Sequence, residues 1–510
     1  MHLVTVPALR ASLHACVALV VVGVLGLAAA GCGSSADAAA TETTATPTRQ
    51  AAAIPETTDT SGSGLFDASV VHQITVSFAQ EDYDALTQAY QETGGKEWIK
   101  ATVTIDGQTY ENVGMRLKGN SSIMGLRQSG GTGGAGGVTG GGRTGGAGPM
   151  GAGGPMTGDA SFDDPESLPW LIDLDKYVDN QNHDGVVELV VRSNTSETAL
   201  NEAVALDLLR EAGLASEKAT YVRFTINGSE TALRLVIEHP DDMWMAENFS
   251  ITGALYKAES TGDYSYRGDD PDSYDEVFDQ EAGKSNADLT PLMEFLDFIN
   301  NSDDATFNAQ LPDRLDIDAF ATYLAMQELL RNSDDIDGPG NNSYLYFDTK
   351  TEKFTVVAWD HNLAFGAMGG GGGVGGMGNG MPQGIQRPEE MDLPDGATIP
   401  PGGQGQGQAG AQQPADPQGQ SGGQGKFRGL DGFGGAKSNI LVTRFKANTE
   451  WQQLYEDRLA ELRTDLYQSG KAAEILAAWV AVLKTEASDL VDAATVDQEA
   501  ASISGQLTAG

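Results

Sequence analysis

Apolar and polar residues alternate in several short stretches of this chain, and such a two-residue period is typical of strands that bury one face. The first stretch covers residues 70–78, and two more strands, joined by the turn Asp106-Gly107, are predicted within residues 99–117. Another hairpin is predicted around Asn227-Gly228, a strong signal for a tight turn. Further strands are predicted at residues 169–174, 186–192, 221–226, 231–237, 344–347 and 354–358.

Other stretches place apolar residues three or four positions apart, which is the spacing of a helix with one buried face. In residues 200–212 these positions include Leu200, Val204 and Leu208, and Gly213 is a natural stop. Strands in one part and helices in another predict an α+β body of two lobes. Helices are also predicted at residues 81–94, 289–300, 316–332, 454–466 and 472–483, so that the chain beyond residue 240 is expected to be mainly helical.

Glycine is concentrated in two tracts. Residues 130–158 and 366–437 together hold 41 of the 65 glycines. Tracts of this composition are flexible linkers, and they predict long insertions at residues 129–158 and 366–437 of a body that covers residues 66–510. The rest of the body has ordinary globular composition, and residues 438–506 are predicted to form its packed helical end.

The chain is strongly acidic. Its 510 residues include 31 Lys and Arg but 72 Asp and Glu, a formal net charge of −41. A field of this sign repels phosphate backbones, which excludes binding of nucleic acid through the bulk of the surface. The glycines follow no G-X-Y period and there are only 2 cysteines, which excludes collagen-like and disulfide-stapled proteins.

The first residues are predicted to be a secretion signal, residues 1–31. They contain one basic residue, Arg10, and an apolar run shorter than the roughly 18 residues of a membrane-spanning helix. Cys32 directly follows Ala29-Ala30-Gly31, which resembles a bacterial lipobox, so Cys32 is predicted to carry lipid and residues 32–65 to form a disordered tether. The protein is therefore expected outside the cytoplasm, anchored to the membrane as a lipoprotein. Secretion without an anchor is the alternative.

A turn of small residues ends the strand pair predicted within residues 99–117. The segment Gly119-Asn120-Ser121-Ser122 would let backbone N–H groups approach a phosphate, with positive charge from Lys118. It matches neither the P-loop pattern nor the G-x-G-x-x-G fingerprint, so an ordinary hairpin turn is the alternative interpretation.

A second constellation lies between residues 332 and 362. Asp337 is followed after four intervening residues by Asn342, then by a predicted hairpin and by Asp360. Protein kinases use this order: the first Asp orients or deprotonates the acceptor hydroxyl, and the Asn and second Asp hold metal ions on the ATP phosphates. The spacing gives Asp337 the first role and Asn342 and Asp360 the metal roles. The alternative is a simple turn between a helix and a hairpin.

Several segments together resemble the CotH family, secreted protein-kinase-like proteins named after a spore-coat component. The segments occur in the order of that family and lie within residues 70–366. They are residues 114–122, the helix start Leu200-Asn201-Glu202, residues 221–228, residues 253–257, residues 337–346 and Trp359-Asp360.

The resemblance implies an atypical, two-lobed protein-kinase-like fold with long Gly-rich loop insertions, and ATP between the lobes with Mg or Mn. It also implies transfer of the γ-phosphate to Ser or Thr of extracytoplasmic proteins. By position, Asp337 would be the catalytic Asp, Asn342 and Asp360 the metal ligands, and Glu202 the helix acid that pairs with a lysine. The residues near the phosphates would be Arg116, Lys118, Gly119, Asn120 and Ser121.

One departure from the family concerns the lysine partner of Glu202. Residues 169–174, where the family often has lysines, contain none. The partner would then be Lys118, Lys176 or Lys257, and without one a catalytically silent kinase-like protein that binds a surface or coat partner is expected. The remaining alternatives are an enzyme of the same fold that moves a different group onto protein, and a wall-associated lipoprotein that binds no nucleotide.

Overall fold

A computed structural model describes residues 64–120, 122–127, 160–250, 252–259, 262–284, 287–332, 334–337, 342–367 and 439–509. All of them belong to the second of the two units into which the chain divides, Asp59–Gly510. The predicted signal and nearly all of the tether lie outside the described residues, with Cys32 and Ser121. The same is true of almost all of both Gly-rich tracts.

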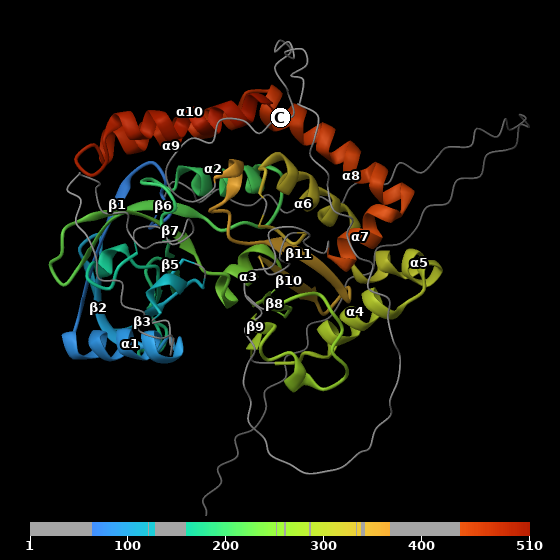
Figure 1. The fold of residues 1–510 in the computed structure, drawn as a ribbon, viewed down its shortest axis with the longest axis horizontal. Coiled ribbons are helices and arrows are strands. Elements are labelled where there is room, and N and C mark those ends of the chain that lie inside the picture. Colours follow the sequence, from blue (N-terminus) through green and yellow to red (C-terminus); the bar gives the residue numbers. More distant parts are fainter. Residues whose placement is uncertain are drawn as a thin grey trace, which may run out of the picture. The chain divides into compact units, whose positions relative to one another are not determined.

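Seven strands close into a barrel in the order β1-β2-β3-β4-β5-β7-β6 (Figure 1). Closure depends on β1, which pairs antiparallel with β2 and parallel with β6, so that Ile74 lies opposite both Ile105 and Phe224. The strands are β1 (Val71–Phe78), β2 (Ile99–Ile105), β3 (Gln108–Leu117), β4 (Trp170–Asp173), β5 (Glu188–Val191), β6 (Ala219–Ile226) and β7 (Ala232–Glu238).

The barrel interior is filled by the apolar positions of the alternating strands. Ile74, Val76 and Val103 are completely buried there, because alternate side chains of a strand point to the same face. Helix α1 (Gln80–Thr93) packs on the same core. It ends at Gly94, whose φ of +82° lies in the left-handed region that favours glycine at the end of a helix.

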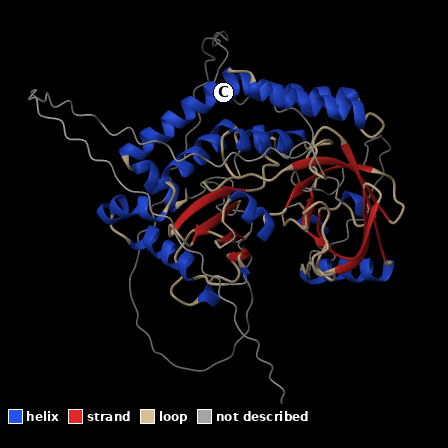
Figure 2. Ribbon diagram, turned by 180° about the vertical axis from the view of Figure 1, so that it is seen from behind, coloured by secondary structure: helices blue, strands red, loops and turns tan. Residues whose placement is uncertain are grey.

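A second, four-stranded sheet has the order β11-β10-β8-β9 and shares a larger apolar core with most of the helices (Figure 2). Its strands are β8 (Ala254–Ala258), β9 (Phe278–Ala282), β10 (Ser343–Asp348) and β11 (Lys353–Ala358). The helices are α2 (Leu200–Glu211), α3 (Asp242–Asn248), α4 (Thr290–Asn301), α5 (Asp304–Arg314), α6 (Ile317–Leu329), α7 (Ile440–Ala447), α8 (Thr449–Leu462), α9 (Lys471–Glu486) and α10 (Ala493–Ala509).

Helix α2 connects the barrel to the larger core. Its first seven residues, 200–206, are all buried, which is typical of a helix in the interior of a protein. It contacts β6 of the barrel on one side and helices α9 and α10 on another. The side chains at its first turn are therefore held from several directions.

The α+β class predicted from the hydrophobic pattern is confirmed. The first lobe differs from the kinase-like lobe that the resemblance implied, because its strands close into a barrel. The closing pair, Val71 with Tyr221, joins positions 150 apart, and no local pattern predicts such a pairing. Strands β8 and β9 lie in a stretch predicted to be mainly helical, and each has only five residues, too few for a clear period.

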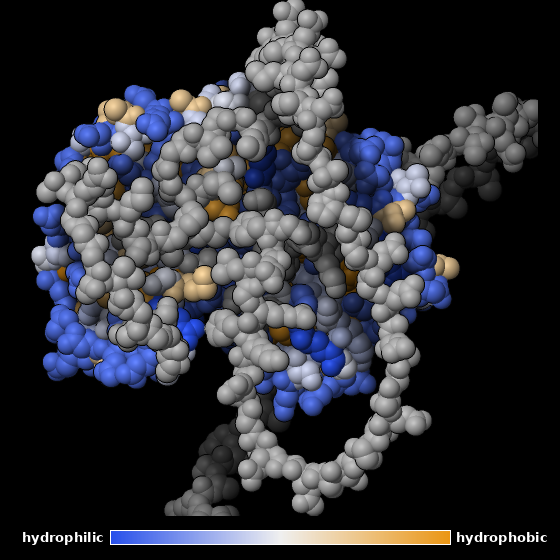
Figure 3. All heavy atoms as spheres, viewed as in Figure 1, coloured by the Kyte–Doolittle hydropathy of each residue, from blue (hydrophilic) through white to orange (hydrophobic). Residues whose placement is uncertain are grey.

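Hydrophilic residues predominate among the described ones on the face shown in Figure 3. None of the described helices is both long and apolar enough to span a membrane. Single exposed apolar side chains are ordinary on protein surfaces, and buried polar groups are the more informative feature. Such groups gather where the ends of β3, β5 and β7 come close to the end of β11.

Candidate active site

Arg192 directly follows β5 and joins two acids from distant parts of the chain. Its guanidinium binds the carboxylate of Glu202 on α2, with 2.9 Å from Nε to Oε2 and 2.8 Å from Nη2 to Oε1. The same Nη2 also donates to Oδ1 of Asp360. Arg192 and Glu202 are buried, whereas the side chain of Asp360 is 26% exposed. This triad of Arg192, Glu202 and Asp360 therefore reaches solvent through Asp360.

The charges of this triad depend on one another. Burial on its own would lower the pKa of Arg192, but the carboxylates of Glu202 and Asp360 outweigh burial and raise that pKa. Glu202 also accepts a hydrogen bond from the backbone N–H of His361. An arginine fork presents several donors in one plane, so a single guanidinium can hold both acids.

The backbone turns sharply where it delivers Asp360. Strand β11 ends at Ala358, and Asp360 has a φ of +63°, in the left-handed region that Asp tolerates better than most residues. His361 is completely buried, and the amide of Gln327 on α6 donates to its Nε2 at 3.2 Å. Burial lowers the pKa of His361 to about 4, so the ring is neutral at pH 7. His361 therefore anchors the Asp360 turn to α6.

Asn342 binds Asp334, and Asp334 is close enough to Asp360 to be affected by its charge. Nδ2 of Asn342 donates to the backbone carbonyl of Asp334 at 2.8 Å, and the amide also hydrogen-bonds the Asp334 carboxylate. Burial, and then the negative charge of Asp360, raises the pKa of Asp334 to about 6. Two carboxylates and an amide thus converge from the loop after α6, the start of β10 and the end of β11.

Asp337 contacts the segment that precedes α7. Its Oδ1 accepts a hydrogen bond from the backbone N–H of Asn439 at 3.2 Å, directly before α7. Asp335 and Asp337 also line a surface groove of about 340 Å³, together with Lys446 of α7. The structure therefore brings Asn342 and Asp360 together with Asp334, and it places Asp337 at the groove.

A buried residue lies between Asp334 and Asp337 in the same loop. Ile336 is completely buried, and its backbone N–H donates to the hydroxyl of Tyr323 on α6 at 3.3 Å. Asp334 precedes this buried residue and Asp337 follows it. The spacing along the sequence does not reveal this contact.

Lys118 is buried just beyond β3 and is held by a histidine. Its Nζ lies 2.7 Å from Nε2 of His239, and Nδ1 of the same ring lies 2.5 Å from Oε2 of Glu188. Burial lowers the pKa of Lys118 to about 7. The ammonium lies 5.9 Å from the centre of the Trp359 ring, so it is close to the turn that carries Asp360.

The other residues of the predicted phosphate turn have neighbours of their own. The guanidinium of Arg116 lies 5.1 Å from the centre of the Trp98 ring, and Oδ1 of Asn120 accepts from Nζ of Lys96 at 2.6 Å. Burial, and then the positive charge of Arg116, lowers the pKa of Lys96 to about 8. Gly119 has a φ of +86°, which favours glycine. Positive groups held this close together favour an anion nearby.

The partner of Glu202 is Arg192, and the lysine that the resemblance implied is replaced by an arginine from the next strand. Arg192 is the last residue of the stretch predicted as a strand at 186–192, but nothing in that pattern marked it as the partner of an acid. The three lysines considered from the sequence, Lys118, Lys176 and Lys257, contact His239, the Trp98 ring and Glu259, respectively.

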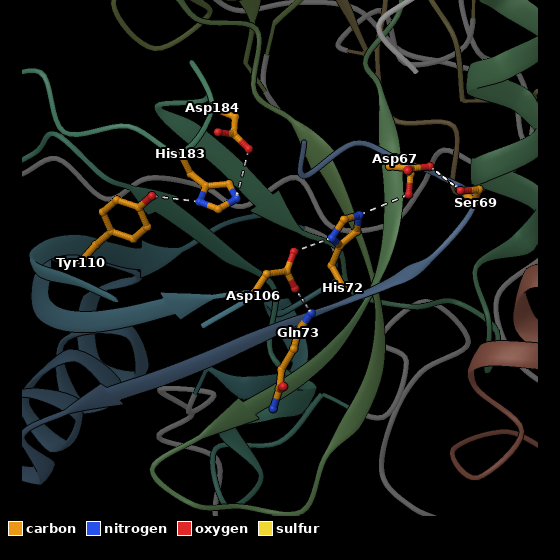
Figure 4. A network of polar contacts seen from close by, with 8 residues as sticks. All are labelled: Asp67, Ser69, His72, Gln73, Asp106, Tyr110, His183 and Asp184. Atoms are coloured by element: carbon orange, nitrogen blue, oxygen red, sulfur yellow. Dashed lines mark hydrogen bonds and ion pairs between the residues drawn. The ribbon is translucent and has the colours of Figure 1, made fainter. Parts of the chain in front are cut away.

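A separate polar network lies on the barrel (Figure 4). Nδ1 of His72 lies 2.6 Å from Oδ2 of Asp106, and Oδ1 of Asp106 accepts from the backbone N–H of Gln73 at 2.8 Å. The hydroxyl of Tyr110 lies 2.9 Å from Nδ1 of His183. These contacts tie the β2–β3 turn to β1 and the loop before β5 to β3, which is a structural role.

The acids near Asp360 fit the way magnesium is bound in phosphoryl-transfer enzymes. Among the described residues, no three His, Cys, Asp or Glu side chains are arranged to hold a metal ion by themselves. Magnesium commonly takes one or two carboxylates and completes its shell with waters and substrate phosphates. Asp334, Asp360 and the amide of Asn342 supply oxygen atoms of this kind.

A family model described as CotH kinase protein matches residues 158–499, about two thirds of the chain. A match of this extent decides the family. The chain belongs to the CotH kinase family. The matched residues include Glu202, Asp334 and Asp360, whereas the predicted phosphate turn precedes them and Cys32 lies far outside. The family inferred from the sequence motifs is thereby confirmed.

A curated relative is also similar to part of the chain. Inner spore coat protein H of Bacillus subtilis (strain 168) is 24% identical over 172 residues, which cover 33% of this chain and 46% of that protein. The chain thus matches less than half the length of this relative.

Proposed function

We propose that this protein is an exported kinase that transfers the γ-phosphate of ATP, bound with Mg or Mn, to Ser or Thr of proteins outside the cytoplasm. The observation that carries the proposal is the convergence of Asp334, Asn342 and Asp360 beside the Arg192–Glu202 pair. Phosphoryl transfer needs positioning and charge stabilisation more than covalent chemistry, and these residues supply both. ATP would lie between the barrel and the second sheet.

Asp334 is the residue that we assign to the acceptor hydroxyl. Its carboxylate lies beside Asn342 and Asp360, whereas Asp337, which the spacing favoured, binds the start of α7. With a pKa of about 6, Asp334 is mostly ionised at pH 7. It could therefore accept a hydrogen bond from a Ser or Thr hydroxyl and take its proton during transfer.

Asn342 and Asp360 would hold the metal ion, with Asp334 close by. Nδ2 of Asn342 donates to Asp334, which leaves the amide oxygen as the atom to face a cation. Burial, and then repulsion from Asp360, raises the pKa of Asp334, and a cation at this place would relieve that repulsion. When bound, the ion would neutralise charge on the ATP phosphates.

The phosphates would be bound at the barrel end of the site. Lys118 lies beside Trp359, and Arg116 approaches from the same strand end. The backbone at Gly119, Asn120 and Ser121 would approach the phosphates, and Glu202 would keep Arg192 in place. This assignment departs from the roles implied by the family resemblance in two places: Asp334 takes the role of Asp337, and Arg192 replaces the lysine.

A catalytically silent protein that binds a surface or coat partner is the second candidate, because Arg192 already binds Asp360. That ion pair would have to open before a cation could reach Asp360 through its Oδ1. A silent protein would bind its partner without turning over nucleotide. An enzyme that moves a different group of the nucleotide onto protein would use the same residues with the nucleotide in another position.

We also place the protein outside the cytoplasm, anchored through lipid on Cys32. The support is the apolar N-terminal run and the Ala-Ala-Gly-Cys sequence that ends it. The substrates would then be extracytoplasmic proteins, and the acidic surface disfavours nucleic acid as a partner.

A labelling experiment tests the proposed reaction. Residues 33–510 are incubated with Mg or Mn, a panel of acidic and Ser-rich acceptor proteins, and ATP labelled on either its α- or its γ-phosphate. Transfer of the γ-label alone, lost in Asp360→Asn, supports the kinase. Transfer of the α-label would identify transfer of the nucleotide instead. Nucleotide binding without transfer of either label, with every metal and acceptor, would favour the silent protein.

A further inference from the structure

Glu499 of the C-terminal helix α10 binds three groups of the turn that precedes α2. Its Oε1 accepts from the backbone N–H of Glu197 at 3.0 Å, and its Oε2 accepts from the hydroxyl of Ser196 at 3.0 Å. The hydroxyl of Thr198 also donates to Oε2. A single carboxylate, 302 positions away from Glu197, thus holds this turn.

The turn depends on this carboxylate because it starts a helix that has no cap of its own. Ala199 occupies the capping position with a φ of +53° and has no side-chain acceptor. Instead, the hydroxyl oxygen of Ser196 accepts from the N–H of Ala199 at 3.1 Å, and that of Thr198 accepts from the N–H of Leu200 at 3.2 Å. Both hydroxyls then donate to Glu499, which completes the cap from a distant element.

The same turn contacts the segment that carries Asp360. The hydroxyl of Thr195 donates to the backbone carbonyl of Asn362 at 3.2 Å, and Nδ2 of Asn201 donates to the same carbonyl at 2.6 Å. Glu202 follows directly and accepts from the backbone N–H of His361. The turn therefore lies between Glu499 and residues 360–362.

Helix α10 also reaches the loop that carries Asp334. Arg331, at the end of α6, donates to the side-chain oxygen of Gln506 on α10. Glu499 and Gln506 are seven positions apart, about two helical turns, so they lie on the same face of α10. This face contacts the turn that precedes Glu202 and also Arg331, which precedes Asp334.

Helix α9 fixes the remainder of α2 in the same way. Nε1 of Trp479 donates to Oδ2 of Asp207 at 2.8 Å, and Nζ of Lys471 lies 3.2 Å from Oε1 of Glu211. The C-terminal helices are therefore bound to α2 along its length, from its capping turn to its last residue.

We propose that Glu499 is a positioning residue: by capping α2 from α10 it holds Glu202 and the Asp360 turn in the arrangement that transfer requires. Its effect on turnover rests on the proposed kinase function. Its effect on the order of the site does not, because the contacts from Glu499 through residues 195–202 to Asn362 and His361 exist without substrate.

Glu499→Gln in the full mature chain is the most direct variant. It keeps the shape and one acceptor oxygen, but it cannot accept hydrogen bonds at both ends of the head group. Asp497→Asn is the matched control, because it removes the same charge from the same helix at a residue that faces Lys484 of α9. Native protein and both variants are compared by hydrogen exchange without nucleotide and by steady-state kinetics.

We expect the backbone N–H groups of residues 197–202 and also of residues 359–363 to exchange about tenfold faster in Glu499→Gln than in Asp497→Asn. The kcat should fall by about tenfold or more, with the KM for ATP nearly unchanged, because alignment is lost before binding is. Faster exchange confined to residues 197–202 would make Glu499 a local cap and overturn the proposal. If the native protein transfers no phosphate, the kinase function fails and the exchange comparison still decides the role of Glu499.

Discussion

Arg192 binds both carboxylate oxygens of Glu202, through Nε at 2.9 Å and through Nη2 at 2.8 Å. The helix acid of protein kinases pairs with a lysine, whereas Glu202 pairs with an arginine that directly follows β5. The planar fork keeps a donor for Asp360, which a single ammonium could not offer with the same geometry. The pair therefore ties α2, β5 and the end of β11 to one another.

Removing the guanidinium should destabilise the fold. Arg192→Met leaves Glu202 buried without its positive partner, and we expect the free energy of unfolding to fall by about 3–5 kcal/mol. Urea unfolding at pH 7, followed by circular dichroism, measures the change. The double variant Arg192→Met with Glu202→Leu removes both charges and should recover most of the loss. Equal losses in the single and double variants would contradict the account of this pair.

Nucleotide binding should weaken as pH rises through about 7. Burial lowers the pKa of Lys118 to about 7, so its ammonium is charged below that pH and neutral above it. A phosphate is attracted by the charged form only, and Glu281, Lys257, Arg116 and Glu188 are the other charged groups near it. Titration calorimetry with ATP between pH 6 and 8.5 measures the affinity.

Lys118→Arg serves as the control for that profile. Arginine keeps its charge throughout this pH range, so the affinity of the variant should stay nearly constant between pH 6 and 8.5. If the native protein also shows constant affinity, Lys118 does not supply a titrating charge to the phosphates.

Gly119→Ala should harm the predicted phosphate turn. Gly119 has a φ of +86°, and an added Cβ would lie 2.4 Å from the hydroxyl oxygen of Ser122. We expect a loss of about 1–3 kcal/mol in stability together with weaker ATP binding. Gly107 has the same φ of +86° but open space around it, so Gly107→Ala measures the backbone strain alone. Equal ATP affinity in the two variants would show that the turn at Gly119 does not face the nucleotide.

Cys32→Ser should release the protein from the membrane. If Cys32 carries lipid, the native chain made in a bacterial host takes up labelled fatty acid and sediments with membranes. The variant should take up no label. Label that persists in the variant would show that the lipid is attached at a position other than Cys32.

Local patterns predicted the elements well where the side chains alternate clearly. The strand at 70–78, the turns at Asp106-Gly107 and Asn227-Gly228, and the helix from Leu200 all correspond to elements of the structure. Barrel closure was not predictable in this way, because it depends on β1 meeting β6 across 150 positions. Such a pairing is decided by the whole core and not by either strand alone.

The site was predictable in its residue types more than in its geometry. The segment between residues 332 and 362, with Asp337, Asn342 and Asp360, was recognisable as a cluster of acids and amides around a hairpin. The surroundings of Asp334 and of Asp337 differ in three dimensions, which the spacing does not show. The sequence also does not predict the role of Arg192. An arginine at a strand end is common, and its contact with Glu202 depends on the three-dimensional fold.

The most direct test of the account compares Asp334→Asn with Asp337→Asn. Both variants remove one carboxylate from the same loop, and the rate of γ-phosphate transfer to an accepted protein substrate is measured for each with saturating ATP and metal. If Asp334 serves the acceptor hydroxyl, its variant should lose about 100-fold or more in kcat, and Asp337→Asn should keep most of the native rate. A large loss in Asp337→Asn with a nearly native rate in Asp334→Asn would contradict the central claim.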